Sequence, residues 1–260
     1  MSVKFPFQPQ EEWERRVKTG RVFVNNKTVM PEFLISVSDE ISHHNPRVVE
    51  PSVPDEVEVL EESEDYLIVY KPAPMPMHPG GRYFKNTLTE ILNDQGFENL
   101  RITHRLDAVT SGIVLLAKNK SFAKKTMYCF AEGKVKKTYN AMVDGIPSEK
   151  MTTINAPIRR KKGFVFECGE YLEGAKQART HFKVIEERKQ TSIIECIPET
   201  GRTHQIRLHL GHWGYPIVDD LIYGKDGDQS SKTTQKRAIS LISIGLTIKS
   251  LGIEYSLKKD

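Results

Sequence analysis

Short apolar runs of strand length predict a sheet in the central part of the chain. Residues 67–70 and 113–117 are apolar but too short for helices, so we interpret them as buried strands. In residues 138–143 apolar and polar positions alternate, which places Tyr139 on the apolar face of a strand. Residues 164–198 predict three more strands, and no segment of crossover-helix length separates them. We therefore expect antiparallel pairing.

The segments between these strands predict short helices. Ser121 is expected to cap a helix in which Phe122 and Cys129 share one apolar face, and Gly133 is expected to end it. Thr203 is expected to cap a second helix.

The last strands, at residues 239–244 and 253–257, are expected at a sheet edge and without a catalytic part. A mixed, largely antiparallel central sheet flanked by helices and loops predicts the α+β class.

Proline content and charge suggest two parts, residues 1–50 and 51–260. The first part predicts a helix at 11–20, a strand at 21–24 and a turn at Asn25-Asn26. It carries seven Lys and Arg against seven Asp and Glu. Because phosphate binding depends on excess positive charge, this part should hold phosphate only weakly, and a packing appendage is the alternative.

Charge is concentrated in the middle of the chain, although the net charge is only +4. Residues 101–162 hold 14 Lys and Arg against 4 Asp and Glu, while residues 51–100 hold 3 against 10. Such a basic region is typical of a phosphate-rich partner, and a solvated lysine-rich helix face is the alternative. A basic cluster at 159–162, predicted on a turn that ends at Gly163, is explained equally well by phosphate contact and by solubility.

The composition bears on membrane insertion, secretion and the redox compartment of the protein. With 38% hydrophobic residues, the chain has no apolar run near the ~20 residues that span a bilayer, so we expect no membrane. It starts without a signal-peptide pattern. Cys129, Cys168 and Cys196 are scattered, which favours a reducing compartment. We expect a cytoplasmic monomer.

One acidic residue, Asp107, lies in a polar segment between His104, Arg105 and Thr110, directly before the apolar run at 113–117. Loops held by a buried strand often carry catalytic groups. From position alone, a catalytic aspartate and a surface salt bridge are equally good interpretations.

Three segments resemble the RluA family of RNA pseudouridine synthases. The segment HRLDAVTSG, from His104, resembles the catalytic signature; KTYNAMVDG, from Lys137, and GRTHQIRLH, from Gly201, resemble two further motifs. The resemblance implies the pseudouridine synthase fold, with Asp107 as the essential aspartate. It implies that Tyr139 stacks on the target base, where core packing is the alternative, and that Arg207 pairs with Asp107 and lowers its pKa.

The same resemblance supplies the expected RNA contacts and substrate. RNA binding is expected at a set of polar residues around the motifs: His104, Arg105, Thr110, Lys136, Lys137, Arg202, His204 and Gln205. Residues 1–50 resemble the second half of a small RNA-binding domain whose first helix is missing. The stretch at 41–88 resembles the branch that acts on the tRNA anticodon loop, so tRNA is favoured and ribosomal RNA is second. At Asp219 the family usually has glycine, which leaves the geometry of that turn open.

The chemistry needs no redox change or phosphate energy, and we expect no cofactor, nucleotide or metal. His204, His209 and His212 lack a cysteine or carboxylate at zinc-ligand spacing. A nucleoside hydrolase would normally need two carboxylates or a metal, and no such pair is visible. A non-catalytic RNA-binding protein with the same fold would not need Asp107, Tyr139 and Arg207 together.

Overall fold

The computed structural model describes residues 9–44, 49–227 and 237–257. The chain divides into two compact units, residues 1–50 and 51–260. Each has its own hydrophobic core.

The first unit packs one helix on a small antiparallel sheet. It contains α1 (Gln10–Lys18), β1 (Val22–Val24), β2 (Lys27–Thr28) and β3 (Ile41–His43), with β1 in the centre of the sheet. Trp13 and Val17 of α1 are buried together with Val22. The predicted turn at Asn25-Asn26 is confirmed: both residues have positive φ, 50° and 62°, as a tight hairpin requires.

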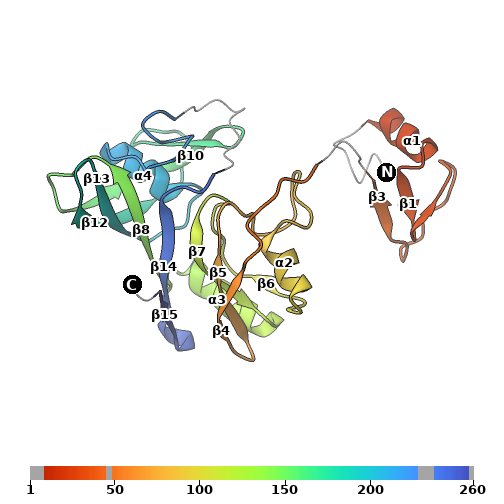
Figure 1. Cartoon of the computed structure of the whole chain (residues 1–260), viewed down its shortest axis with the longest axis horizontal. Helices are drawn as coiled ribbons and strands as arrows, with labels where there is room; N and C mark the ends of the chain where they lie inside the picture. Colours follow the sequence, from red (N-terminus) through yellow and green to blue (C-terminus); the bar gives the residue numbers. More distant parts are fainter. Residues whose placement is uncertain (1–8, 45–48, 228–236, 258–260) are drawn as a thin grey trace. The chain divides into compact units, whose positions relative to one another are not determined.

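In the described part of the second unit, ten strands form one mixed sheet (Figure 1). The long path runs β4-β5-β7-β14-β8-β13-β12-β9; β6 pairs with β7 and β15 with β14. Among the described residues, the strands of this sheet pair in parallel only where β7 meets β14. The predicted largely antiparallel sheet and the α+β class are therefore confirmed. The strands are β4 (Glu58–Glu62), β5 (Tyr66–Lys71), β6 (Arg101–Ile102), β7 (Ser111–Ala117), β8 (Lys136–Asp144), β9 (Met151–Asn155), β12 (Arg179–Glu187), β13 (Thr191–Pro198), β14 (Leu241–Ile248) and β15 (Ile253–Ser256).

Helices cover both faces of this sheet. On one face, α2 (Leu88–Asp94) and α4 (Gln205–Trp213) contribute Leu88 and Leu210 to the larger core. On the other face, α3 (Lys120–Ala131) contributes Phe122 to a second core. Residues of β7 alternate between the two cores, because successive side chains of a strand point to opposite faces.

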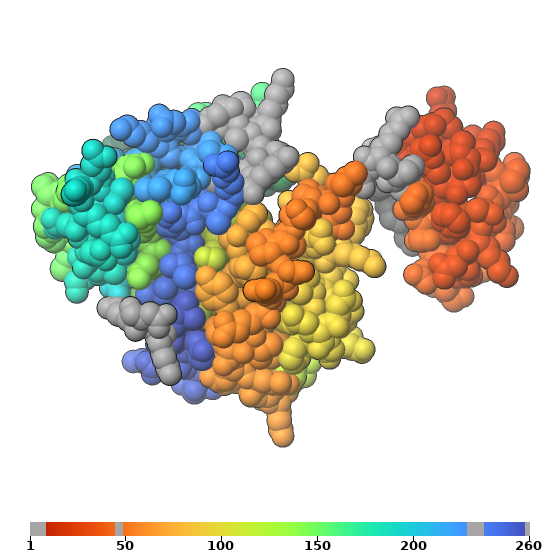
Figure 2. Space-filling model, in the orientation of Figure 1, coloured from red at the N-terminus to blue at the C-terminus, as the bar shows by residue number. Residues whose placement is uncertain are grey.

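The predicted edge position of residues 239–244 is wrong. Strand β14 lies between β7 and β8 in the middle of the sheet, and its second half also pairs with β15. Figure 2 shows the blue C-terminal strands between the orange β4–β5 segment and the green and teal strands. The apolar pattern indicated correctly that this strand is buried, since Leu241, Leu246 and Ile248 are buried. The prediction of its place failed because burial does not specify which strands are neighbours.

Both predicted helix caps are also wrong. The N-cap of α3 is Asn119, two residues before Ser121, and its side chain accepts a hydrogen bond from the Phe122 amide at 2.9 Å. The N-cap of α4 is His204 rather than Thr203, with a left-handed backbone at φ 57° and no side-chain cap. Asparagine caps as well as serine, so residue type alone could not separate adjacent candidates.

The basic cluster at 159–162 lies in a strand rather than on a turn. It belongs to β10 (Ile158–Lys162), which pairs with β11 (Val165–Cys168) in a separate two-stranded sheet. The turn that follows consists of Gly163, at φ 54°, and Phe164. A short helix, η1 (Lys249–Leu251), connects β14 and β15. In the described residues, no helix is long and apolar enough to cross a membrane.

Candidate active site

The loop that carries Asp107 is fixed by a buried lysine from β5. Lys71 Nζ donates to the carbonyl oxygens of Pro72, Met75 and Ala108 at 3.0, 2.9 and 3.3 Å. The Met75 amide also donates to Ala108 O at 2.8 Å. Burial lowers the pKa of Lys71 to about 7, against the raising effect of the Asp107 carboxylate. Because Ala108 follows Asp107 directly, these bonds hold the backbone of the predicted catalytic residue in place.

Arg207 of α4 reaches two carboxylates. Its Nε and Nη2 donate to Asp220 at 2.6 and 2.9 Å, while Nη1 lies 3.4 Å from Oδ2 of Asp107. Asp220 also accepts from the amides of Ile222 and Tyr223, both at 3.0 Å. Burial by itself raises the pKa of Asp220, but the bonds from Arg207 outweigh it and the net pKa is lowered. The predicted partner Asp107 is therefore in reach, and Asp220 takes the shorter bonds.

The turn before Asp220 explains the departure noted at Asp219. Asp219 has φ 64°, a left-handed conformation that glycine adopts most easily and aspartate tolerates better than most residues. The turn forms with aspartate at this position.

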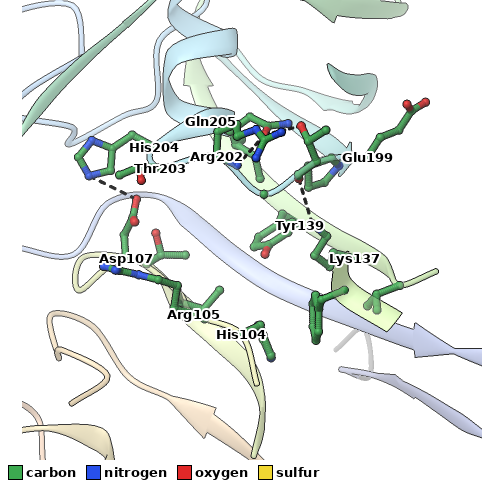
Figure 3. A pocket seen from close by; sticks show the side chains of 18 of the residues that line it. His104, Arg105, Asp107, Lys137, Tyr139, Glu199, Arg202, Thr203, His204 and Gln205 are labelled. Carbon is green, nitrogen blue, oxygen red and sulfur yellow. Dashed lines mark hydrogen bonds and ion pairs between the residues drawn. The ribbon is translucent and has the colours of Figure 1, made fainter. Parts of the chain in front are cut away.

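A cavity of about 560 Å³ connects the three sequence motifs. This size is within the range of small-molecule and nucleotide sites. Figure 3 shows Asp107 and Lys137 toward opposite sides of it, with Tyr139 between them. Its lining includes every residue that the sequence analysis assigned to the site except Lys136: Asp107, Tyr139, Arg207, His104, Arg105, Thr110, Lys137, Arg202, His204 and Gln205.

Tyr139 lies on the inward face of β8, as predicted, and is only 8% exposed. Burial raises the pKa of Tyr139 well above its usual value, and the nearby Asp107 carboxylate raises it further. The phenol is therefore neutral at physiological pH. Its ring borders the cavity, where a flat partner for an extruded base is needed.

His104 is held by its neighbours in the protein. Its Nε2 accepts a hydrogen bond from the Leu115 amide at 3.0 Å, and its ring stacks on Phe130 with centroids 4.9 Å apart. Burial lowers the pKa of His104 to about 3. The residue is thus a neutral part of the cavity wall and does not place a second cation beside Asp107.

Two basic residues, Lys137 and Arg202, line the cavity on the side away from Asp107 and differ in their burial and hydrogen bonds. Lys137 Nζ donates to Thr200 O at 3.0 Å, and burial lowers its pKa to about 8. Arg202 is exposed and donates through Nε to Gln177 O at 3.0 Å. Lys136, the neighbour of Lys137 on β8, is exposed and outside the cavity lining.

Gln205 and Thr110 are buried and bonded within the chain. Gln205 accepts from Thr200 Oγ1 and from the Arg202 amide, and donates to Arg179 O and Thr180 Oγ1, at 2.7 to 3.0 Å. The Thr110 amide donates to Asp107 O at 3.0 Å. We predict RNA binding for both from the motifs; in the structure both shape the cavity wall.

His204 lines the same cavity, close to Asp107. Its Nδ1 is 2.8 Å from the Tyr223 hydroxyl, and its Nε2 is 3.9 Å from Asp107 Oδ2 (Figure 3). Burial lowers the pKa of His204, against the raising effect of the Asp107 carboxylate.

Sequence reasoning did not assign Lys71 or Asp220 to the site. Lys71 ends an apolar strand before a proline-rich loop, and a lysine at a strand end usually reaches solvent. Asp220 is 13 residues from Arg207, and neither helical nor strand period connects them. In the described part of the chain, no group of three or more His, Cys, Asp or Glu is arranged to hold a metal ion.

The comparisons with known proteins identify the family of the chain. The sequence model described as RNA pseudouridylate synthase matches residues 65–212, more than half of the chain, including Asp107, Tyr139 and Arg207. The chain belongs to this family. Among curated relatives, RNA pseudouridine synthase 7 of Oryza sativa subsp. japonica is 35% identical over 92% of this chain and 63% of its own length.

Other members of the pseudouridylate synthase family show similar identities. The mitochondrial tRNA pseudouridine(32) synthase of Saccharomyces cerevisiae is 34% identical over 86% of this chain and 49% of its own length. An uncharacterised RNA pseudouridine synthase of Bacillus subtilis is 32% identical, covering 85% of this chain and 78% of that protein. The chain thus spans about half to two thirds of the plant and yeast relatives.

A solved structure of the family confirms the fold. Human RNA pseudouridylate synthase domain containing 1 superimposes with a TM-score of 0.68 at 28% identity, covering 81% of this chain and 86% of that chain. The pseudouridine synthase fold expected from the motifs is therefore present.

Proposed function

We propose that this chain is an RNA pseudouridine synthase that isomerises specific uridines in RNA. The observation that carries the proposal is Asp107 at the wall of a nucleotide-sized cavity, 3.4 Å from a buried guanidinium and beside the inward-facing ring of Tyr139. The family membership supports the same activity.

The reaction breaks the bond between uracil N1 and ribose C1′, turns the base and joins C5 to C1′. Leaving of the base creates positive character at C1′, as in glycoside hydrolysis, and an anionic carboxylate can capture or stabilise it. We assign this role to Asp107. C5 loses its proton in the last step and N1, freed from the sugar, gains one, so the reaction is an isomerisation that balances without an oxidant or a second substrate.

Two neighbours of Asp107 suit this role. Arg207 supplies a fixed positive charge, and its pKa is raised because Asp220 outweighs the lowering effect of burial. Tyr139 offers a flat neutral ring for the base, and base-aromatic stacking contributes about 1 to 3 kcal/mol. The site thus combines charge stabilisation with a stacking surface.

We favour tRNA as the substrate and keep ribosomal RNA as the second candidate. A relative at 34% identity is named as a tRNA pseudouridine(32) synthase, and the resemblance of residues 41–88 favours the same class. The N-terminal unit is proposed to assist weakly, because its Lys and Arg are balanced by Asp and Glu.

Tritium release from RNA labelled at uracil C5 tests the activity. We expect wild-type protein to release tritium and Asp107→Asn, which keeps the side-chain shape but not the charge, to release none above background. Equal release by both proteins, or none from any cellular RNA pool, would refute the proposal. Free uracil as product would indicate a hydrolase instead.

The substrate is tested by mapping carbodiimide-dependent reverse-transcription stops in a deletion strain. Loss of a stop in tRNA, restored by wild-type protein but not by Asp107→Asn, is the expected result. Restoration by Asp107→Asn would favour a non-catalytic RNA-binding protein. Loss confined to ribosomal RNA would replace tRNA as the substrate.

A further inference from the structure

His204 connects the Asp107 carboxylate to a buried tyrosine behind it. Its Nδ1 is 2.8 Å from the hydroxyl oxygen (Oη) of Tyr223, and the Phe166 amide lies 2.9 Å from the same oxygen. The Phe166 ring also packs edge-on against the imidazole, with centroids 5.3 Å apart. The imidazole is therefore fixed in position from β11 and from the turn after α4.

The direction of these hydrogen bonds determines which imidazole nitrogen carries the proton. An amide N–H can only donate, so Tyr223 Oη accepts from Phe166. Within the part of the chain that the structure describes, Oη has no hydrogen-bond partner other than Phe166 and His204, and Tyr223 is only 8% exposed. The phenol proton therefore points at Nδ1 of His204. A neutral imidazole that accepts at Nδ1 carries its proton on Nε2.

This tautomer directs an N–H group at Asp107. Nε2 lies 3.9 Å from Oδ2, the same oxygen that Arg207 Nη1 approaches at 3.4 Å. The distance is too long for a hydrogen bond, but an N–H dipole at this distance is still attracted by the carboxylate and orients it. The same oxygen thus faces one cation and one neutral donor.

The backbone of His204 supports a site role as well. Its φ of 57° and ψ of 20° are left-handed, a conformation that is uncommon for residues other than glycine, although histidine adopts it more often than most residues do. Residues held in such conformations are concentrated at functional sites.

We propose that His204 is a positioning residue for Asp107, held by Tyr223 as the Nε2–H tautomer, and not a phosphate ligand. The role in catalysis rests on the proposed function, whereas the tautomer does not. The charged and titratable groups around the imidazole are Asp107 and Arg105 from the Asp107 loop, Arg207 from α4, and Asp220 and Tyr223 from the following turn.

The tautomer is measured without any assay of activity. Long-range proton-nitrogen correlation spectra of the full chain, labelled with 15N-histidine, give the protonation of each ring nitrogen; His204→Gln identifies the His204 signals. At pH 7 we expect proton on Nε2 only. Tyr223→Phe removes the donor to Nδ1, and we expect a mixture of tautomers. A wild-type ring with its proton on Nδ1, or doubly protonated, would overturn the proposal, and so would an unchanged tautomer in Tyr223→Phe.

The role is measured by single-turnover kinetics together with RNA binding. Groups that orient an active-site ligand contribute about 10- to 100-fold. We expect His204→Ala to lower the rate constant by about that factor, with the dissociation constant for RNA changed less than about threefold, and His204→Gln, whose amide can donate toward Oδ2, to recover part of it. Tyr223→Phe should move the acid limb of the rate to higher pH, because His204 then protonates more easily.

Other outcomes separate the role of His204 in catalysis from its tautomer. A loss in His204→Ala that lies entirely in RNA affinity, with a smaller salt dependence, would make His204 a phosphate ligand and refute the positioning role. Thermal melting of each variant shows that it is folded. If wild-type protein acts on no RNA, the proposed function and the role in catalysis both fail, while the spectra still decide the tautomer.

Discussion

Arg207 and Asp220 form a two-bond ion pair that is buried on both sides. The bonds measure 2.6 and 2.9 Å, and the two side chains are 2% and 1% exposed. The third guanidinium nitrogen is left facing Asp107 at 3.4 Å. Arg207 is therefore held in place by Asp220, so its position does not depend on Asp107, whose charge must change if it bonds to the sugar.

Removing the Asp220 charge should cost both stability and activity. Asp220→Asn removes the charge of the carboxylate that Arg207 bonds at 2.6 and 2.9 Å, while the Asp107 carboxylate lies farther away at 3.4 Å. Breaking such a buried pair costs about 3 to 5 kcal/mol, and we expect a loss of that size in the free energy of unfolding, measured in urea. Tritium release should fall too, because Arg207 moves toward Asp107.

An exposed ion pair provides the matched control. Glu186 and Arg188 are joined at 2.7 Å but are about half exposed. Glu186→Gln should leave the urea midpoint nearly unchanged, since solvent screens such pairs. Equal effects of Glu186→Gln and Asp220→Asn would contradict the structural role given to Asp220.

Lys71 should make stability depend on pH above neutrality. The folded chain releases the proton near the lowered pKa of about 7, whereas the unfolded chain keeps it up to the ordinary 10.5. Between these values the unfolded state binds more protons, so the free energy of unfolding rises with pH. From pH 7 to 9, the free energy of unfolding of the wild type should rise relative to that of Lys71→Met by up to about 1.4 kcal/mol per pH unit. Lys162→Met, at an exposed position, is the control, and its free energy of unfolding should depend on pH as that of the wild type does. If the curve for Lys71→Met also runs parallel to the wild-type curve, Lys71 stays charged in the folded chain.

Lys137 should contribute a pH-dependent part of RNA affinity. Its pKa of about 8 means that the free protein loses this charge as pH rises through 8, while bound phosphate favours the charged form. Fluorescence anisotropy should show wild-type affinity falling from pH 7 to 9 toward that of Lys137→Met. The slope of affinity against salt should drop by about 0.7 to 0.9 in the variant. Lys136 lies outside the cavity, so Lys136→Met should change the pH dependence and the salt slope of RNA affinity less than Lys137→Met does. A larger effect of Lys136→Met would place the RNA outside the cavity.

Gly112 should tolerate no side chain. It has φ 113°, and a Cβ there would lie 2.2 Å from Ser243 O, where β7 pairs with β14. Gly96 has a similar φ of 94° but nothing within 4 Å of that position. In urea unfolding we expect Gly96→Ala to cost about 1 to 2 kcal/mol for the left-handed backbone alone. Gly112→Ala should cost clearly more, and equal costs would mean that the two strands can separate to make room.

Most of the local structure was predictable because it depends on nearby residues. The buried strand after Asp107, the inward face of Tyr139 and the turn at Asn25-Asn26 follow from apolar period and from residue type. The cap of α3 was misplaced at Ser121 because Asn119 is an equally good cap, and the cap of α4 was misplaced at Thr203 because the helix begins after a left-handed His204 that residue type did not indicate.

The sequence by itself, through its three motifs, predicted which residues do the chemistry: one acid on a loop before a buried strand, one inward aromatic, and one arginine on a later helix. Only the tertiary structure decided their partners, because those contacts join segments that no local period connects. Arg207 lies 100 residues from Asp107 and is held mainly by Asp220, and Lys71 turns inward to the carbonyl of Ala108. A buried charge must find a counter-charge or carbonyl oxygens wherever the packed chain brings them.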